Sequence, residues 1–97
     1  MKFQIKSLKF FRKQISQLDK KSKRIIDNKI QIIKQNPYRY KKLHSHKFSK
    51  VFRIRLRIKK QELRLIYVVV EPNIILVCLL DRGKDYKNLE KYLGMIR

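Results

Sequence analysis

Basic side chains recur at every second position between residues 53 and 59. Apolar residues fill the positions between them, and alternation with a period of two is typical of a β-strand that has one apolar and one charged face. Neighbouring cations on one face repel one another, so a purely structural sheet gains no stability from this row. Its members are Arg53, Arg55, Arg57 and Lys59.

Arg64 joins this charged face if the chain turns back at Lys60-Gln61, because it is then opposite Arg57 on the neighbouring strand. Guanidinium groups donate hydrogen bonds in a fixed fork that matches phosphate. They also stabilise the charge that develops on a phosphorane-like transition state. The spacing is equally compatible with a basic face that only binds backbone phosphate.

Three further polar residues, Arg82, Lys84 and Tyr86, follow the run 74–80, which is apolar at every position. Such a run predicts a central strand that is covered on both faces. Arg82 is then expected just beyond the end of this strand, with Lys84 and Tyr86 close behind. Cys78 lies inside the run, and we expect it to pack in the core, since a reactive thiol needs an electropositive and partly exposed setting.

His44 and His46 form the only clustered pair of potential metal ligands in the sequence. No cysteine or carboxylate lies near them in the chain, so we favour a solvated or RNA-contacting loop over a metal site. The chain has only 2 glycines and no glycine-rich phosphate loop. We therefore expect neither a metal nor another cofactor.

Hydrophobic periodicity predicts the elements that must position these residues. A short strand at residues 2–6 precedes two helices, the first capped by Ser7 and the second by Asp19, and Asn36-Pro37 should end the second helix. A basic connecting segment, 37–50, leads into three strands. These strands and a possible last helix are expected at 52–59, 63–70, 74–80 and 87–96.

This order of elements predicts an α+β fold in a single domain, residues 1–97, in which the first strand and the helical hairpin pack on a mainly antiparallel sheet of about four strands. One hydrophobic core forms between the sheet and the hairpin. The side chains expected to face the hairpin are Phe52, Ile54, Leu56, Ile58 and Leu65.

The formal net charge of +20 is concentrated in the first two-thirds of the chain. Residues 1–60 hold 21 basic and 2 acidic residues, whereas residues 61–97 hold 6 and 5. Nucleic acid is the obvious polyanionic partner, because its binding releases counterions; an anionic membrane or an acidic protein are the competitors. The apolar runs are far shorter than the roughly 20 residues of a membrane-spanning helix. A lone cysteine and a charged amino terminus favour the cytoplasm.

Three segments resemble the RelE/ParE superfamily of toxins. They are Phe52-Arg53-Ile54-Arg55-Leu56-Arg57, then Leu63-Arg64-Leu65-Ile66-Tyr67, then Asp81-Arg82-Gly83-Lys84-Asp85-Tyr86, and Asn36-Pro37 followed by Lys42-Leu43 fits the same pattern. The resemblance implies a toxin of a type II toxin–antitoxin pair that cuts messenger RNA on the ribosome. In RelE-like enzymes the ribose 2′-hydroxyl attacks the adjacent phosphate without a metal. A cognate antitoxin with an acidic segment is the implied partner.

By position, Arg64 and Arg82 match family arginines that orient and stabilise the phosphate, and Tyr86 matches a tyrosine that orients the nucleophile or stacks on a base. Arg53 and Arg55 stand where RelE proteins often carry lysines. Arginine is effectively always protonated, so Arg55 is a poor general base. The titratable alternatives are His44, His46 and Tyr86. Residues expected to act on the phosphate are Arg55, Arg64, Arg82 and Tyr86, and those expected to hold RNA are Arg53, Arg57, Lys59, Lys84, His44 and His46.

Two other functions compete with the ribosome-dependent endoribonuclease. One is a ParE-like toxin that inhibits DNA gyrase by binding it. The other is a non-catalytic module that binds RNA or the ribosome. The arginine strand and the segment 82–86 favour the nuclease over the gyrase inhibitor, whereas the arginines at positions 53 and 55 keep the non-catalytic module open.

Overall fold

The computed structural model describes residues 2–81 and 88–96. Its centre is a five-stranded sheet with the strand order β1-β5-β4-β3-β2. The strands are β1 (Gln4–Ser7), β2 (Lys41–Leu43), β3 (Val51–Ile58), β4 (Gln61–Val70) and β5 (Asn73–Asp81). β1 pairs with β5 in parallel, and the other neighbours are antiparallel. The predicted α+β class is confirmed, and the sheet has one strand more than expected.

The additional strand, β2, lies inside the segment that the sequence indicated as a connection. It has only three residues, and its pattern is exposed, exposed and half-buried. Such a short segment shows no period that could mark it as a strand. It becomes one because Lys41, Lys42 and Leu43 pair with Arg53, Phe52 and Val51 at the edge of the sheet.

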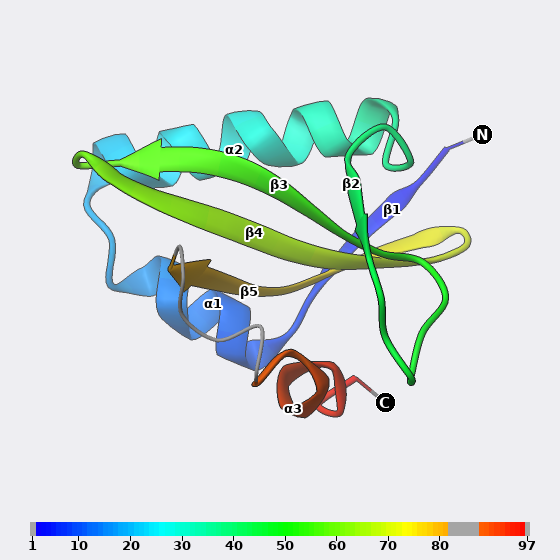
Figure 1. Cartoon of the computed structure of the whole chain (residues 1–97). Helices are drawn as coiled ribbons and strands as arrows, with labels where there is room; N and C mark the ends of the chain where they lie inside the picture. Colours follow the sequence, from blue (N-terminus) through cyan, green and yellow to red (C-terminus); the bar gives the residue numbers. More distant parts are fainter. Residues whose placement is uncertain (1, 82–87, 97) are drawn as a thin grey trace.

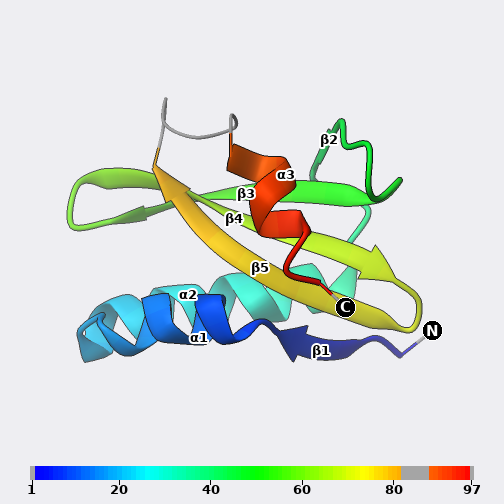
Figure 2. The ribbon, with the colours of Figure 1, turned by 90° about the horizontal axis from the view of Figure 1, so that it is seen from below.

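Helices cover both faces of the sheet. Figure 1 shows the course of the chain, and Figure 2 shows α1 (Lys9–Ser16) and α2 (Lys20–Gln35) on one side of the sheet and α3 (Leu89–Leu93) on the other. The expected helical hairpin and terminal helix are therefore present. No helix among residues 2–81 and 88–96 is long and apolar enough to cross a membrane.

The boundaries of α2 follow the sequence signals, whereas the start of α1 does not. Asp19 caps α2 by accepting a hydrogen bond from the Ser22 amide at 2.9 Å, and the helix ends before Asn36-Pro37. Ser7 was expected to cap α1, and this prediction is wrong. Ser7 stays extended because it is still paired with Leu76 in the sheet, and the helix begins one residue later, without a side-chain cap.

The main core lies between the sheet and the helical hairpin. The five side chains predicted to face the hairpin are all buried there, against Phe11 of α1 and Ile26 and Ile33 of α2. Burying one such side chain is worth roughly 1.5–3 kcal/mol. The Tyr67 hydroxyl donates a 2.6 Å hydrogen bond to the Pro37 carbonyl, which ties the end of α2 to β4.

A second, smaller core lies on the opposite face of the sheet, under α3. Leu89 and Leu93 of α3 pack there on Val51, Ile66 and Cys78. Cys78 is fully buried, and burial raises the pKa of its thiol to about 12. Its predicted packing role is confirmed. One face of the sheet therefore carries both an apolar patch and the row of arginines.

Candidate functional site

The β3–β4 hairpin turns at Lys59-Lys60, not at Lys60-Gln61. Both lysines have positive φ, 51° and 66°, and Ile58 pairs with Gln61. Two-residue turns with both φ values positive match the twist of β-hairpins, and Asn-Gly is their usual signature. Two lysines carry no such signal, which is why the predicted register was wrong.

The corrected register changes which arginines meet. Arg55, not Arg57, is opposite Arg64, and Arg57 is opposite Glu62. The partner of Arg64 has moved by two positions, from Arg57 to Arg55. Because side chains alternate with a period of two, every side chain keeps the face that was predicted for it. Arg53, Arg55, Arg57 and Arg64 lie on the same face, as predicted, and we call these four residues the arginine face.

Burial differs strongly across the arginine face. Arg64 is buried, with 9% of its surface exposed, whereas Arg53 is half-buried and Arg55 and Arg57 are exposed. Arg64 stands on β4 in the middle of the sheet, between Arg55 on β3 and Leu80 on β5. Burial leaves the Arg64 side chain fewer rotamers than its exposed neighbours have.

Arg53 adds an unused donor to this face. Its Nε is buried and has no hydrogen-bond partner among the described residues. A buried polar group without a partner typically costs about 1–3 kcal/mol, so the donor is available to an anion that reaches it. Lys41 of β2 is opposite Arg53 and contributes a further cation. The sequence analysis missed Lys41, because only the pairing of β2 brings it to this face.

Lys59 was expected on the same face, and the structure corrects this. Lys59 belongs to the turn, and its ammonium lies 3.5 Å from Asp19 Oδ2 at the start of α2. The left-handed backbone of the turn breaks the alternation that would have placed Lys59 beside Arg57. Lys59 therefore contacts the helical hairpin, which covers the other face of the sheet.

His44 and His46 lie in the loop after β2, on the side of the sheet that α3 covers. Their rings meet edge to face with centroids 5.0 Å apart, and both residues are exposed. The His46 amide donates a 3.0 Å hydrogen bond to Glu90 of α3, and this bond is the main reason why the pKa of Glu90 is lowered. Within the described part of the chain, no three potential metal ligands come together.

Arg82, Lys84 and Tyr86 lie outside the described residues, so their predicted roles stay predictions. The structure does show where the chain approaches them. β5 ends at Asp81, one residue after Leu80, which is the direct partner of Arg64. The four arginines of the arginine face can bind and neutralise a phosphodiester, but none of them can accept a proton at ordinary pH.

No protein-family model matches the sequence, and no curated protein matches it. Solved structures do resemble the fold. A mutant of the E. coli toxin RelE in the free state shares 16% identity at a TM-score of 0.77, with both chains covered completely. The archaeal RelE–RelB complex from Pyrococcus horikoshii OT3 shares 23% identity at a TM-score of 0.63, covering 88% of this chain and 100% of that one. The intact E. coli RelBE toxin–antitoxin complex shares 13% identity at a TM-score of 0.64, covering 87% of this chain and 100% of that one.

Proposed function

We propose that this chain, which has a RelE-like fold, is the toxin of a type II toxin–antitoxin pair and cleaves messenger RNA on the ribosome. The observation that carries the proposal is the pair Arg55 and Arg64, which are directly opposite each other with Arg53 nearby on β3. Like charges in this arrangement repel, and a bound phosphodiester relieves the repulsion. The net charge of +20 supports a polyanionic substrate.

In the proposed reaction the ribose 2′-hydroxyl attacks the adjacent phosphorus and the 5′-oxygen leaves, without a metal. Arg64 is held on a central strand and stabilises the charge on the phosphoryl oxygens as the transition state forms. Arg53 and Arg55 hold the phosphate in line. By the resemblance to RelE toxins, Arg82 adds a second stabilising guanidinium and Tyr86 orients the nucleophile. His44, His46 and Tyr86 are the candidates for proton transfer.

Single-turnover cleavage of messenger RNA on programmed ribosomes tests this function. Arg64→Gln should lower the rate at saturation by about 10²-fold, the typical effect of losing one preorganised donor. Arg24→Gln is the matched control, since Arg24 is exposed on α2 and lies off the arginine face. Equal saturated rates for the wild type and Arg64→Gln would contradict the proposed role of Arg64.

The proposed partner is an antitoxin with an acidic segment that covers the arginine face. Two of the similar structures are a RelBE toxin–antitoxin complex and a RelE–RelB complex, and the charge of this chain would otherwise promote indiscriminate RNA binding. Segments of this kind typically fold on binding and wrap a large area. Native purification at low salt should recover a small acidic companion, and its absence would count against this partner.

One observation favours a second candidate, a non-catalytic module that binds RNA or the ribosome. The four residues of the arginine face are all arginines, so a proton acceptor must be supplied by a residue outside these four. If the wild-type protein binds programmed ribosomes tightly and cuts no messenger RNA there, the second candidate replaces the first.

A further inference from the structure

Two pairs of like charges lie next to each other on one face of the sheet. Lys41 of β2 and Arg53 of β3 are direct partners in an antiparallel pairing, so their side chains are on the same face. The same face carries the pair Arg55 and Arg64, which joins β3 to β4. β3 therefore takes part in two cross-strand pairs of like charge, one with each neighbouring strand. Each pair is unfavourable by itself, and an anion placed between its two members relieves the repulsion.

The distance between the two pairs suits a nucleic-acid backbone. Arg53 and Arg55 are two residues apart on β3, and their pairs extend to opposite sides of this strand. With a rise of about 3.3 Å per residue and about 4.8 Å between strands, the centres of the two pairs are roughly 8 Å apart. Neighbouring phosphates of an extended single strand have a similar separation, and the long side chains of lysine and arginine accommodate the difference. The two pairs therefore match two consecutive phosphates of one strand.

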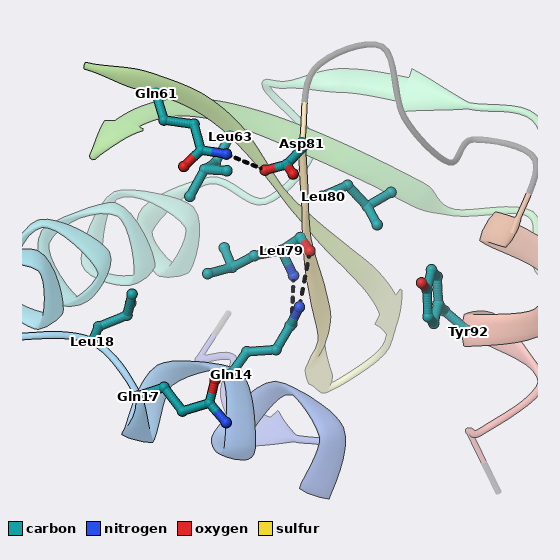
Figure 3. A pocket seen from close by; sticks show the side chains of 9 residues that line it. All are labelled: Gln14, Gln17, Leu18, Gln61, Leu63, Leu79, Leu80, Asp81 and Tyr92. Carbon is teal, nitrogen blue, oxygen red and sulfur yellow. Dashed lines mark hydrogen bonds between the residues drawn. The ribbon is translucent and has the colours of Figure 1, made fainter. Parts of the chain in front are cut away.

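The side of the arginine face toward β5 is bordered by packed elements. Leu80 of β5 is the partner of Arg64 and lies in the core under α3. Figure 3 shows the Leu80 side chain on the side of β5 where Tyr92 of α3 lies. At the edge of β5, Gln14 of α1 binds both backbone groups of Leu79, as Figure 3 also shows. An RNA strand over Arg64 therefore meets protein in this direction.

The opposite side, toward β2, ends the sheet. β2 is the outermost strand, and its two lysines, Lys41 and Lys42, are exposed. Their side chains point to opposite faces, because Lys42 is paired with Phe52, which lies in the main core under the helical hairpin. Of these two cations, only Lys41 is on the face that carries Arg55. An RNA strand that lies over the arginine face can therefore leave it across β2, past Lys41.

We propose that the two pairs bind two consecutive phosphates of one RNA strand. Arg55 and Arg64 hold the phosphate at which cleavage occurs, and Lys41 holds the next phosphate, toward the edge of the sheet. Arg53 lies between the two positions, and its guanidinium has enough N–H donors to bind either phosphate. Lys41 is thus a positioning residue that sets the direction in which RNA crosses the sheet. The inference rests on the proposed function for its substrate, and it needs RNA binding but not RNA cleavage.

Trimers of 2′-O-methyluridine without terminal phosphates test this inference, because each has two phosphates and cannot be cleaved by 2′-hydroxyl attack. In two matched trimers, a neutral methylphosphonate replaces one phosphate or the other. The wild type should bind the trimer with two phosphates about fivefold more tightly than either neutralised trimer at fixed low salt, which is the upper end for one exposed ion pair. Lys41→Gln should bring this ratio close to one, since the second phosphate then has lost its cation at the edge of the sheet.

Two further variants are matched controls. Lys42→Gln makes the same change of charge on the same strand but on the other face, and it should keep the wild-type ratio. Lys41→Arg keeps the positive charge and should keep the ratio too. All three variants should melt at the temperature of the wild type, because both lysines are exposed. A wild-type ratio near one, or an equal fall of the ratio in Lys41→Gln and Lys42→Gln, would overturn the inference.

Cleavage on programmed ribosomes separates this inference from the proposed function. Lys41→Gln should raise the protein concentration that gives half-maximal cleavage and leave the saturated rate nearly unchanged, because Lys41 holds the substrate away from the reacting atoms. If the wild type cuts nothing there while the trimer ratio exists and collapses in Lys41→Gln, the nuclease proposal fails and the second phosphate site stands. If cleavage occurs and the trimer ratio does not respond to Lys41→Gln, the nuclease stands and the second phosphate site fails.

Discussion

Arg55 on β3 and Arg64 on β4 are directly opposite each other, although no turn signal in the sequence predicts this register. Two like charges in a cross-strand pair destabilise a sheet. We therefore expect the repulsion within this pair to favour any state in which an anion lies over both guanidinium groups.

Replacing Arg55 should accordingly stabilise the free protein. We expect Arg55→Thr to raise the free energy of unfolding by about 0.5 kcal/mol in low salt, because one like-charge pair is lost. Inorganic phosphate should raise the Tm of the wild type more than that of the variant. Arg57→Thr is the matched control, since Arg57 is opposite Glu62 and its loss should not stabilise. Denaturant titration and thermal melting measure both effects, and a less stable Arg55→Thr variant would contradict the interpretation.

Arg82 and Arg53 should differ in what they contribute to RNA cleavage. We expect Arg82→Ala to lower the saturated single-turnover rate by about 10²–10³-fold with ribosome affinity nearly unchanged, because the resemblance to RelE toxins implies that Arg82 stabilises the phosphate in the transition state. Arg53→Ala should mainly weaken binding and reduce the salt slope by about one unit. The measurements are cleavage and binding on programmed ribosomes across a range of salt concentrations. An unchanged saturated rate in Arg82→Ala would show that the role assigned to Arg82 is wrong.

Asp19 should make the stability of the protein depend on pH in the acid range. The hydrogen bond from Ser22 is the largest cause that lowers the pKa of Asp19 in the folded chain, and the Lys59 charge lowers it further. The stabilisation is therefore fully present above the unfolded pKa, about 3.9, and is lost as the pH falls through the lower folded pKa.

The variants of Asp19 separate its cap from its charge. Asp19→Ala should lower the Tm at pH 7, because the first turn of α2 loses its cap. Asp19→Asn keeps a capping side chain, so its Tm should fall less than that of Asp19→Ala. If melting from pH 2 to pH 7 shows the same acid dependence in the wild type and Asp19→Asn, the shift in pKa does not contribute to stability.

Gln14 should be more important for stability than the other glutamine of this region. Gln14→Ala leaves both backbone groups of Leu79 without the amide that now pairs with them. We expect a loss of roughly 1–3 kcal/mol, the cost of an unsatisfied polar group. Faster exchange of the Leu79 amide hydrogen should accompany it. Gln17→Ala serves as the control, and equal losses for the two variants would rule out the proposed pairing.

Local patterns in the sequence were sufficient to predict much of the fold. Alternation with a period of two placed the arginines of β3 on one face and the apolar side chains on the other, because side-chain direction in a strand depends only on parity. Asp19 and Asn36-Pro37 set the limits of α2 through contacts within a few residues. The apolar run around Cys78 predicted a strand with two covered faces, and both cores contain its residues.

The tertiary structure alone decided the features that depend on distant residues. The left-handed turn at Lys59-Lys60 matched Arg55 with Arg64 and moved Lys59 to Asp19, since the register of a hairpin follows from backbone geometry and not from residue type alone. Lys41 reached the arginine face only through the pairing of β2. Gln14 and Leu79 are 65 residues apart, and their contact exists because the end of β5 lacks a strand on one side. No local pattern records such a contact, because it arises only when separate elements pack together.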